Sequence, residues 1–176
     1  MQYRYEPTPD EQLQAVEHIV HETRCLYRSY QLIQRRGRLV DRLGADEELF
    51  VFSAAFNDFV LHYRCLIHFF TDEPEARKTP EKAKECDDVV ARHYVRSWKA
   101  PPMPFWAAWR DKVSKVLAHL TYTRCRINGL DHRTHFGPMS KEIQSAWKLF
   151  LGSHPVHEKA FEHELHEDGL RNWLLE

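Results

Sequence analysis

The feature that most constrains this chain is a long apolar run, ELFVFSAAFNDFVLHYRCLIHFF, which extends from Glu48 to Phe70. A run of this length and apolarity predicts a helix that is buried on most of its surface. It is interrupted by polar residues, among them Asn57, Asp58, His62 and Arg64. Each of these side chains would be costly to bury in lipid, so we expect the run to form a helix in the protein core and not to span a membrane. We expect no membrane partner. Inside a protein core, these polar side chains need partners from another segment.

Length and composition predict one all-helical domain over residues 1–176. The chain is long enough to bury a substantial core, and it has only six glycines, which argues against a many-turned β fold. Its formal net charge is −1, which excludes a strongly basic surface but leaves room for a local basic patch. No basic segment leads into an apolar run at the start, so we expect a cytoplasmic protein without a secretory signal.

Two helices are predicted in the first part of the chain. Thr8 is the expected N-cap of a helix that begins with Pro9 and continues to about Gln34. The apolar run is expected to begin with the acidic residues 46–48, which favour a helix N-terminus, and to end before Pro74.

The second part of the chain predicts shorter elements around one further long helix. We expect a short helix over residues 87–96, an extended crossing through the prolines of residues 100–104, and a long helix from Phe105 to about Asn128. Ser140 is expected to cap a helix over residues 141–151, and the tail forms one helix or two around Gly169. The predicted fold is a single-domain helical bundle with two long core helices and a proline-rich crossover.

A candidate site begins on the apolar run. Asn57, Arg64 and His68 share one helical face, and Asp58 and His62 form a second pair four residues apart. An arginine supplies a fixed positive fork, and a histidine supplies a proton donor or acceptor near neutral pH. The alternative is that Arg64 and His68 lie at a rim, where water or surface acids satisfy them.

A second polar stripe, on the helix that begins at Phe105, carries His119 and Tyr122, with Arg124 beside it. If the two long helices pack antiparallel, this stripe brings His119 toward Arg64 and His68. The candidate catalytic residues are therefore Arg64, His68 and His119. The candidate binding residues are Asn57, His62, Tyr122 and Arg124.

Metal and cofactor binding have weaker support in the sequence, and we expect neither. The pairs His132-x-x-His135 and His163-x-x-His166 have spacings that can ligate, and His62 with His119 and Asp72 or Asp88 would be another ligand set. Twelve histidines make such pairs common by chance, and the four cysteines form no C-x-x-C. No phosphate-binding loop or hydrolase motif is present.

Part of the chain, roughly residues 50–125, resembles small helical bacterial proteins of the HEPN superfamily, including those of abortive-infection and toxin–antitoxin systems. The resemblance lies in Asn57, His62, Arg64 and Leu66, in Asp87-Asp88, and in His119-Leu120-Thr121-Tyr122 with Arg124. It implies a helical bundle that is often dimeric. In active members it implies a metal-independent ribonuclease with an Arg-x4–6-His motif, whereas Arg64 and His68 here are separated by three residues.

Two main functions follow from these observations. In the first, a HEPN-like protein binds or cleaves RNA in a defence or toxin–antitoxin system: Arg64 holds a phosphate, and His68 or His119 moves the proton of a ribose hydroxyl. In the second, a non-catalytic module uses exposed Trp and Phe residues to pair with a helical protein partner or with a second copy of itself. A metal-binding bundle remains a further alternative.

Overall fold

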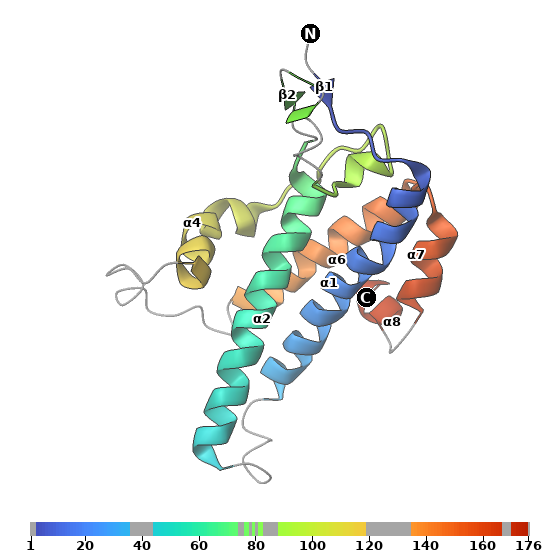
Figure 1. Ribbon diagram of the computed structural model, residues 1–176. Coiled ribbons are helices and arrows are strands. Elements are labelled where there is room, and N and C mark those ends of the chain that lie inside the picture. Colours follow the sequence, from blue (N-terminus) through green and yellow to red (C-terminus); the bar gives the residue numbers. More distant parts are fainter. Residues whose placement is uncertain are drawn as a thin grey trace. The chain divides into compact units, whose positions relative to one another are not determined.

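The computed structural model describes residues 3–35, 44–73, 76–77, 79, 81–82, 88–118, 135–166 and 170–175. This part of the chain contains six α-helices, one short 3₁₀ helix and one pair of two-residue strands (Figure 1). The predicted all-α fold is confirmed, and no helix in the described ranges has the length and apolarity needed to cross a membrane.

The chain divides into two compact units, which are described separately. Unit 1 comprises residues Met1–His21, Leu66–Pro102 and Gln144–Glu176, and unit 2 comprises Glu22–Cys65 and Met103–Ile143. Helices α1, α2 and α6 contribute residues to both. The prediction of a single domain over residues 1–176 stays a prediction.

Helix α1, Pro9–Gln34, begins where the sequence predicts. The hydroxyl of Thr8 accepts the backbone N–H of Glu11 at 3.3 Å, and the carboxylate of Glu11 accepts the backbone N–H of Thr8 at 2.7 Å. This reciprocal pair is a capping box, which satisfies backbone donors at the helix start. The buried side of α1 consists of Val16, Ile19, Val20, Thr23, Leu26, Ser29 and Ile33.

Helix α2, Ala45–Thr71, is the predicted core helix. Its N-terminus is capped by Glu47, whose carboxylate accepts the backbone N–H of Gly44 at 3.1 Å. Its last residue, Thr71, donates its hydroxyl proton to the backbone oxygen of Ile67 at 2.8 Å. The buried residues of α2 are Ala55, Phe59, Val60, His62, Tyr63, Leu66, Ile67, Phe69 and Phe70.

In unit 2, the second half of α1 runs antiparallel to α2 (Figure 1). The direction follows from the contacts, because Glu22 meets His62 whereas Tyr30 meets Phe59. The ring of Phe136 packs edge-on against Phe59 at a centroid distance of 4.6 Å. The apolar face of α2 is therefore covered within this unit by α1 and by the residues that lead into α6.

Glu142 of α6, Gly137–Gly152, caps the start of α4, Pro104–Ala118. Its carboxylate accepts the backbone N–H groups of Phe105 at 2.5 Å and of Trp106 at 3.3 Å, and the hydroxyl of Tyr63 at 2.7 Å. A negative charge is favourable there because the first N–H groups of a helix have no partner inside the helix. Burial and the neighbouring Glu142 raise the pKa of Tyr63 above its ordinary value, so this hydroxyl stays protonated.

Unit 1 is built around aromatic side chains. Neighbouring rings lie with centroids 4.9 to 6.4 Å apart, mostly edge to face, in a cluster of Phe69, Phe70, Tyr94, Trp98, Trp147, Phe150 and Phe161. The indole N–H of Trp98 donates to the backbone oxygen of Phe70 at 2.7 Å, so this buried donor is satisfied. The tail forms two helices, α7 (Glu158–Leu165) and α8 (Leu170–Leu175). Their apolar residues Phe161, Leu165, Leu170, Trp173 and Leu174 are buried.

Two predicted elements differ in the structure. Of the short helix expected over residues 87–96, the described part contains only a 3₁₀ helix, Ala91–His93, because Val90 is extended and Tyr94 already ends the turn. Ser140 is not an N-cap, since α6 begins three residues earlier at Gly137 and the Ser140 side chain is buried.

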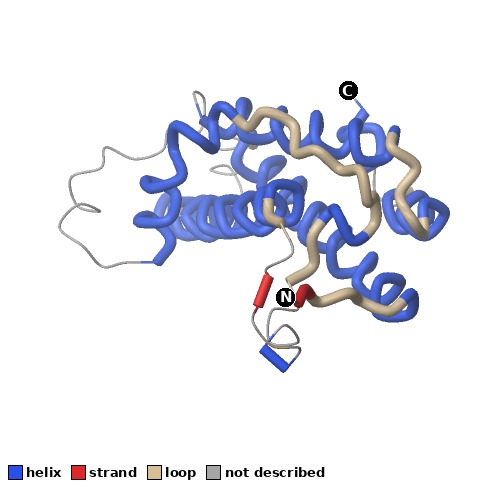
Figure 2. Tube along the Cα trace, turned by 90° about the horizontal axis from the view of Figure 1, so that it is seen from above, coloured by secondary structure: helices blue, strands red, loops and turns tan. Residues whose placement is uncertain are grey.

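Other segments match the prediction or lie beyond it. Residues 99–103 form no helix or strand, as expected for the proline-rich crossover. The expected continuation of α4 to Asn128 lies outside the described residues. A short antiparallel pairing of β1, Tyr3–Arg4, with β2, Ala76–Arg77, has no counterpart in the prediction (Figure 2).

Candidate functional site

His62 is held between two carboxylates in unit 2. Only 8% of the residue is exposed. Its Nδ1 lies 2.7 Å from Oε2 of Glu22 on α1, and its Nε2 lies 3.1 Å from Oδ1 of Asp58, one turn earlier on α2. The other oxygen of Asp58 accepts the hydroxyl of Ser29 on α1. The ring therefore connects the two helices through both of its nitrogen atoms.

This arrangement favours the imidazolium form of His62. Burial lowers the pKa of the ring, but the hydrogen bonds and negative charges of Glu22 and Asp58 outweigh burial and raise it above its ordinary value. Both ring nitrogens donate when histidine is charged, which matches two carboxylate acceptors. His62 thus forms a clamp between α1 and α2, and in its charged form it has no lone pair that could take a proton from a substrate.

The two cysteines near this clamp are weak nucleophiles. Burial and the charge of Glu22 raise the pKa of Cys65 to about 11. Burial, with the charges of Asp58 and Glu22, also raises the pKa of Cys25. Since the thiolate is the reactive form, neither side chain favours nucleophilic catalysis at neutral pH.

The structure describes three of the other predicted site residues. Asn57 is exposed and Arg64 is half-buried. His68 is exposed, and its Nδ1 pairs at 2.7 Å with Asp72, the residue that follows α2. His119, Tyr122 and Arg124 lie outside the described residues. Their predicted convergence with Arg64 and His68 therefore stays a prediction.

The partner of His62 on a second helix is Glu22 of α1, whereas the sequence predicted such partners in the segment around His119. Glu22 and Ser29 were missed. Glu22 and Ser29, seven residues apart, share one face of α1, and Asp58 and His62, four residues apart, share one face of α2; this pattern was the available signal. It could have been used only if α1 had been identified as the neighbour of α2.

Three histidines of the pairs considered as metal ligands lie in the described part of the chain. Among the described residues, no group of three or more His, Cys, Asp or Glu side chains could hold a metal ion. His163 and His166 are exposed. His135 packs edge-on against Trp109, with ring centroids 4.3 Å apart, and its sequence partner His132 lies outside the described residues.

A second candidate site is the open face of α2, which we call the α2 seam. It consists of residues separated alternately by three and four positions: Glu47, Phe50, Ala54, Asn57, Leu61 and Arg64. The first five are exposed and Arg64 is half-buried. Phe50 is 76% exposed and Leu61 is 48% exposed. This spacing is that of the contact positions in a coiled coil, where a second helix covers such a row.

No family model, curated protein or solved structure matches this chain. The resemblance to HEPN proteins therefore stays a prediction. The functional argument depends on the geometry of the chain itself.

Proposed function

We propose that this protein is a non-catalytic helical interaction module that pairs with a second copy of itself through the α2 seam. The observation that carries the proposal is an open row of contact positions with an exposed phenylalanine near one end and an exposed leucine near the other. A large aromatic side chain left open to water on the longest helix supports association, because covering it removes apolar surface from water. The prediction also invoked exposed tryptophans, and Trp106 and Trp109 on α4 are half-buried.

The spacing of the seam favours an antiparallel pair of α2 helices. In that register Phe50 faces Leu61 of the second copy, Ala54 faces Asn57, and Glu47 faces Arg64. Two-fold symmetry repeats each contact, as in most homodimers. The small side chain of Ala54 lets the helices approach closely at the centre. A parallel pair would instead place Glu47 against Glu47 and Arg64 against Arg64.

The same contacts set the strength of the dimer. Covering two Phe50 and two Leu61 side chains contributes roughly 6 kcal/mol, allowing for their present partial burial. The two Glu47–Arg64 pairs between the copies add at most about 1 kcal/mol each. Association itself costs a similar amount or more. We therefore expect a concentration-dependent dimer.

The test is sedimentation velocity of the full chain over a range of concentrations. The wild type should shift from monomer to dimer as concentration rises, and Phe50→Asp should remain monomeric. Leu149→Asp is the matched control, since Leu149 on α6 is 52% exposed and does not belong to the seam. It should dimerise like the wild type. A wild type that is monomeric throughout, or a Phe50→Asp variant that dimerises normally, would refute the proposal.

We keep a cytoplasmic location as part of this proposal. Its support is that Cys25 and Cys65 are free thiols, which persist in a reducing compartment.

RNA cleavage has less support, because His62 is saturated by carboxylates and His68 is paired with Asp72 at the exposed end of α2. It stays a separate prediction with its own test below.

A further inference from the structure

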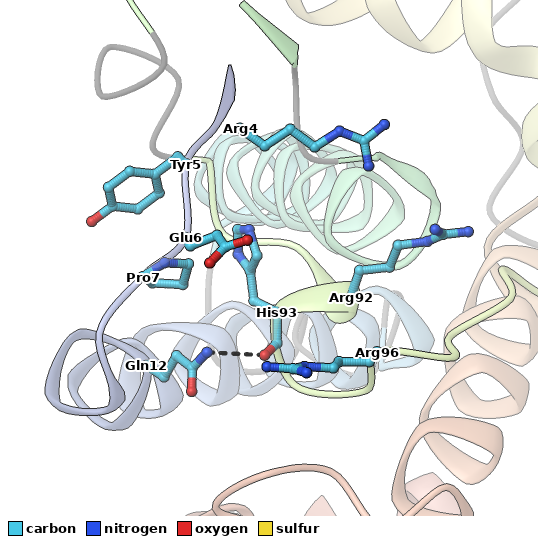
Figure 3. A pocket seen from close by; sticks show the side chains of 8 residues that line it. All are labelled: Arg4, Tyr5, Glu6, Pro7, Gln12, Arg92, His93 and Arg96. Atoms are coloured by element: carbon cyan, nitrogen blue, oxygen red, sulfur yellow. Dashed lines mark hydrogen bonds between the residues drawn. The ribbon is translucent and has the colours of Figure 1, made fainter. Parts of the chain in front are cut away.

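Unit 1 contains a cavity of about 480 Å³ with three arginines in its lining, Arg4, Arg92 and Arg96 (Figure 3). Arg4 comes from β1, whereas Arg92 and Arg96 come from the 3₁₀ helix Ala91–His93 and the residues that follow it. The figure shows the side chains of Arg4 and Arg92 extending to the same side of the pocket, while Arg96 extends toward Gln12. Segments far apart in the sequence thus contribute positive charge to one cavity.

The charges of this cavity are only partly balanced. Arg92 forms an ion pair with Glu73 at 2.8 Å. Arg4 and Arg96 are exposed and form no ion pair within the described part of the chain. Glu6 is the one carboxylate in the lining. The arginines therefore exceed the carboxylates around them, in a chain whose overall charge is −1.

The base of the cavity is fixed before any ligand binds. The side-chain amide of Gln12 on α1 donates to the backbone oxygen of His93 at 3.0 Å, and the hydroxyl of Tyr94 donates to the backbone oxygen of Gln12 at 2.9 Å. These two bonds join the arginine-bearing turn to α1. A fixed backbone lowers the ordering cost of binding, although the arginine side chains themselves must still be ordered.

His93 adds no charge to this base at neutral pH. Burial lowers its pKa, and Glu6 and the backbone of Tyr5 only partly offset that effect. Nδ1 lies 3.5 Å from the backbone N–H of Val90, a long contact in which that nitrogen is the acceptor. The attraction for an anion therefore comes from the arginines.

We propose that this cavity binds a small phosphate monoester, with the phosphoryl oxygens held by arginine guanidinium groups. Guanidinium forks bind phosphate oxygens in pairs, and a dianion can engage more than one arginine at once. The volume lies in the range of small-molecule sites, so it leaves room for an organic group beyond the phosphate. Tyr5 and Pro7, which also line the cavity, provide an apolar surface for that group.

Isothermal titration calorimetry with phenyl phosphate, benzoate and phenol tests the proposal. Phenyl phosphate should bind, benzoate should bind at least tenfold more weakly, and phenol should not bind. Arg96→Gln should weaken phenyl phosphate binding roughly tenfold or more, because it removes charged hydrogen bonds. Arg110→Gln, which removes the same charge from an exposed arginine outside the lining, should bind like the wild type.

Three results would overturn the proposal: no binding of phenyl phosphate, equal binding of benzoate, or an unchanged affinity in Arg96→Gln. Circular dichroism of Arg96→Gln should match the wild type, because Arg96 is exposed and unpaired within the described residues. The proposal does not depend on dimer formation. Sedimentation of Arg96→Gln should show the wild-type association, so failure of one proposal leaves the other open to its own test.

Discussion

Replacing His62 with alanine should destabilise the protein far more than replacing His68, although both histidines lie four residues from an aspartate on the same helix. His62 makes two contacts with carboxylates, to Glu22 at 2.7 Å and to Asp58 at 3.1 Å. Its side chain is 10% exposed, whereas that of His68 is 46% exposed. Comparing the two alanine variants therefore distinguishes a buried histidine held by two carboxylates from an exposed histidine–aspartate pair with the same four-residue spacing.

The expected loss follows from these exposures. A hydrogen bond to a charged group contributes about 1.5–3 kcal/mol when its surroundings are dry. The carboxylates of Glu22 and Asp58 remain 33% and 47% exposed, so water would partly replace the histidine. A discounted value of about 1 kcal/mol for each contact, with about 1 kcal/mol for the lost ring packing, gives about 3 kcal/mol for His62→Ala. His68→Ala should cost less than about 0.5 kcal/mol.

The pH dependence provides a second check on the same variant. The folded-state pKa of His62 is raised above its ordinary value, which is near 6.5 in an unfolded chain. Its contribution is therefore complete below about pH 6.5 and is lost as the pH rises through the folded-state pKa. The difference in unfolding free energy between wild type and His62→Ala should be largest near pH 6 and smaller at pH 9.

Urea denaturation at several pH values measures both effects. Thermal unfolding should show a decrease in Tm of about 6–12 °C for His62→Ala near pH 6, given the size of the chain. Equal destabilisation by His62→Ala and His68→Ala would refute the clamp. A difference that stays constant or grows from pH 6 to pH 9 would refute the assigned charge state.

Three further predictions concern other parts of the structure. Glu142→Gln removes the charge that caps α4 and should lower the unfolding free energy in urea by about 1–2 kcal/mol, whereas an unchanged value would show that the cap is unimportant. In a variant with Cys65 as its only cysteine, alkylation by iodoacetamide at pH 7.5 should be about a hundredfold slower than that of a free thiol, because the pKa is about 11; a normal rate would contradict the burial argument. The ribonuclease hypothesis predicts that RNA cleavage in the presence of a chelator decreases in Arg64→Ala and His119→Ala, and an equal background in all three proteins would reject it.

The sequence allowed helix starts and apolar faces to be predicted where the signal was local. Thr8 and Glu11 form their capping box within three residues of each other. Ser140 misled the prediction because a serine before an apolar stretch resembles an N-cap, although the side chain is buried within α6. Local sequence signals therefore predicted the presence of a helix more reliably than the residues at which it begins and ends.

Long-range pairings could not be read in the same way. Glu22 and His62 are forty residues apart, and nothing in the local pattern of either helix identifies the other as its partner. The sequence of the apolar run also does not distinguish its exposed face from its buried face. Phe50 and Leu61 are apolar, as core residues are, but both are exposed in the structure. An apolar residue on a helix is equally consistent with burial in the monomer and burial by a second chain.

The most direct test of the central claim is disulfide cross-linking between two copies in a background where the native cysteines are replaced by serine. Chains with Phe50→Cys and chains with Leu61→Cys should cross-link when mixed, because the antiparallel register places these positions opposite each other. Neither variant should cross-link with itself, since identical positions would then lie about 16 Å apart along the helix axis. Cross-linking of Phe50→Cys with itself, or no cross-linking in the mixture, would contradict an antiparallel pair of α2 helices.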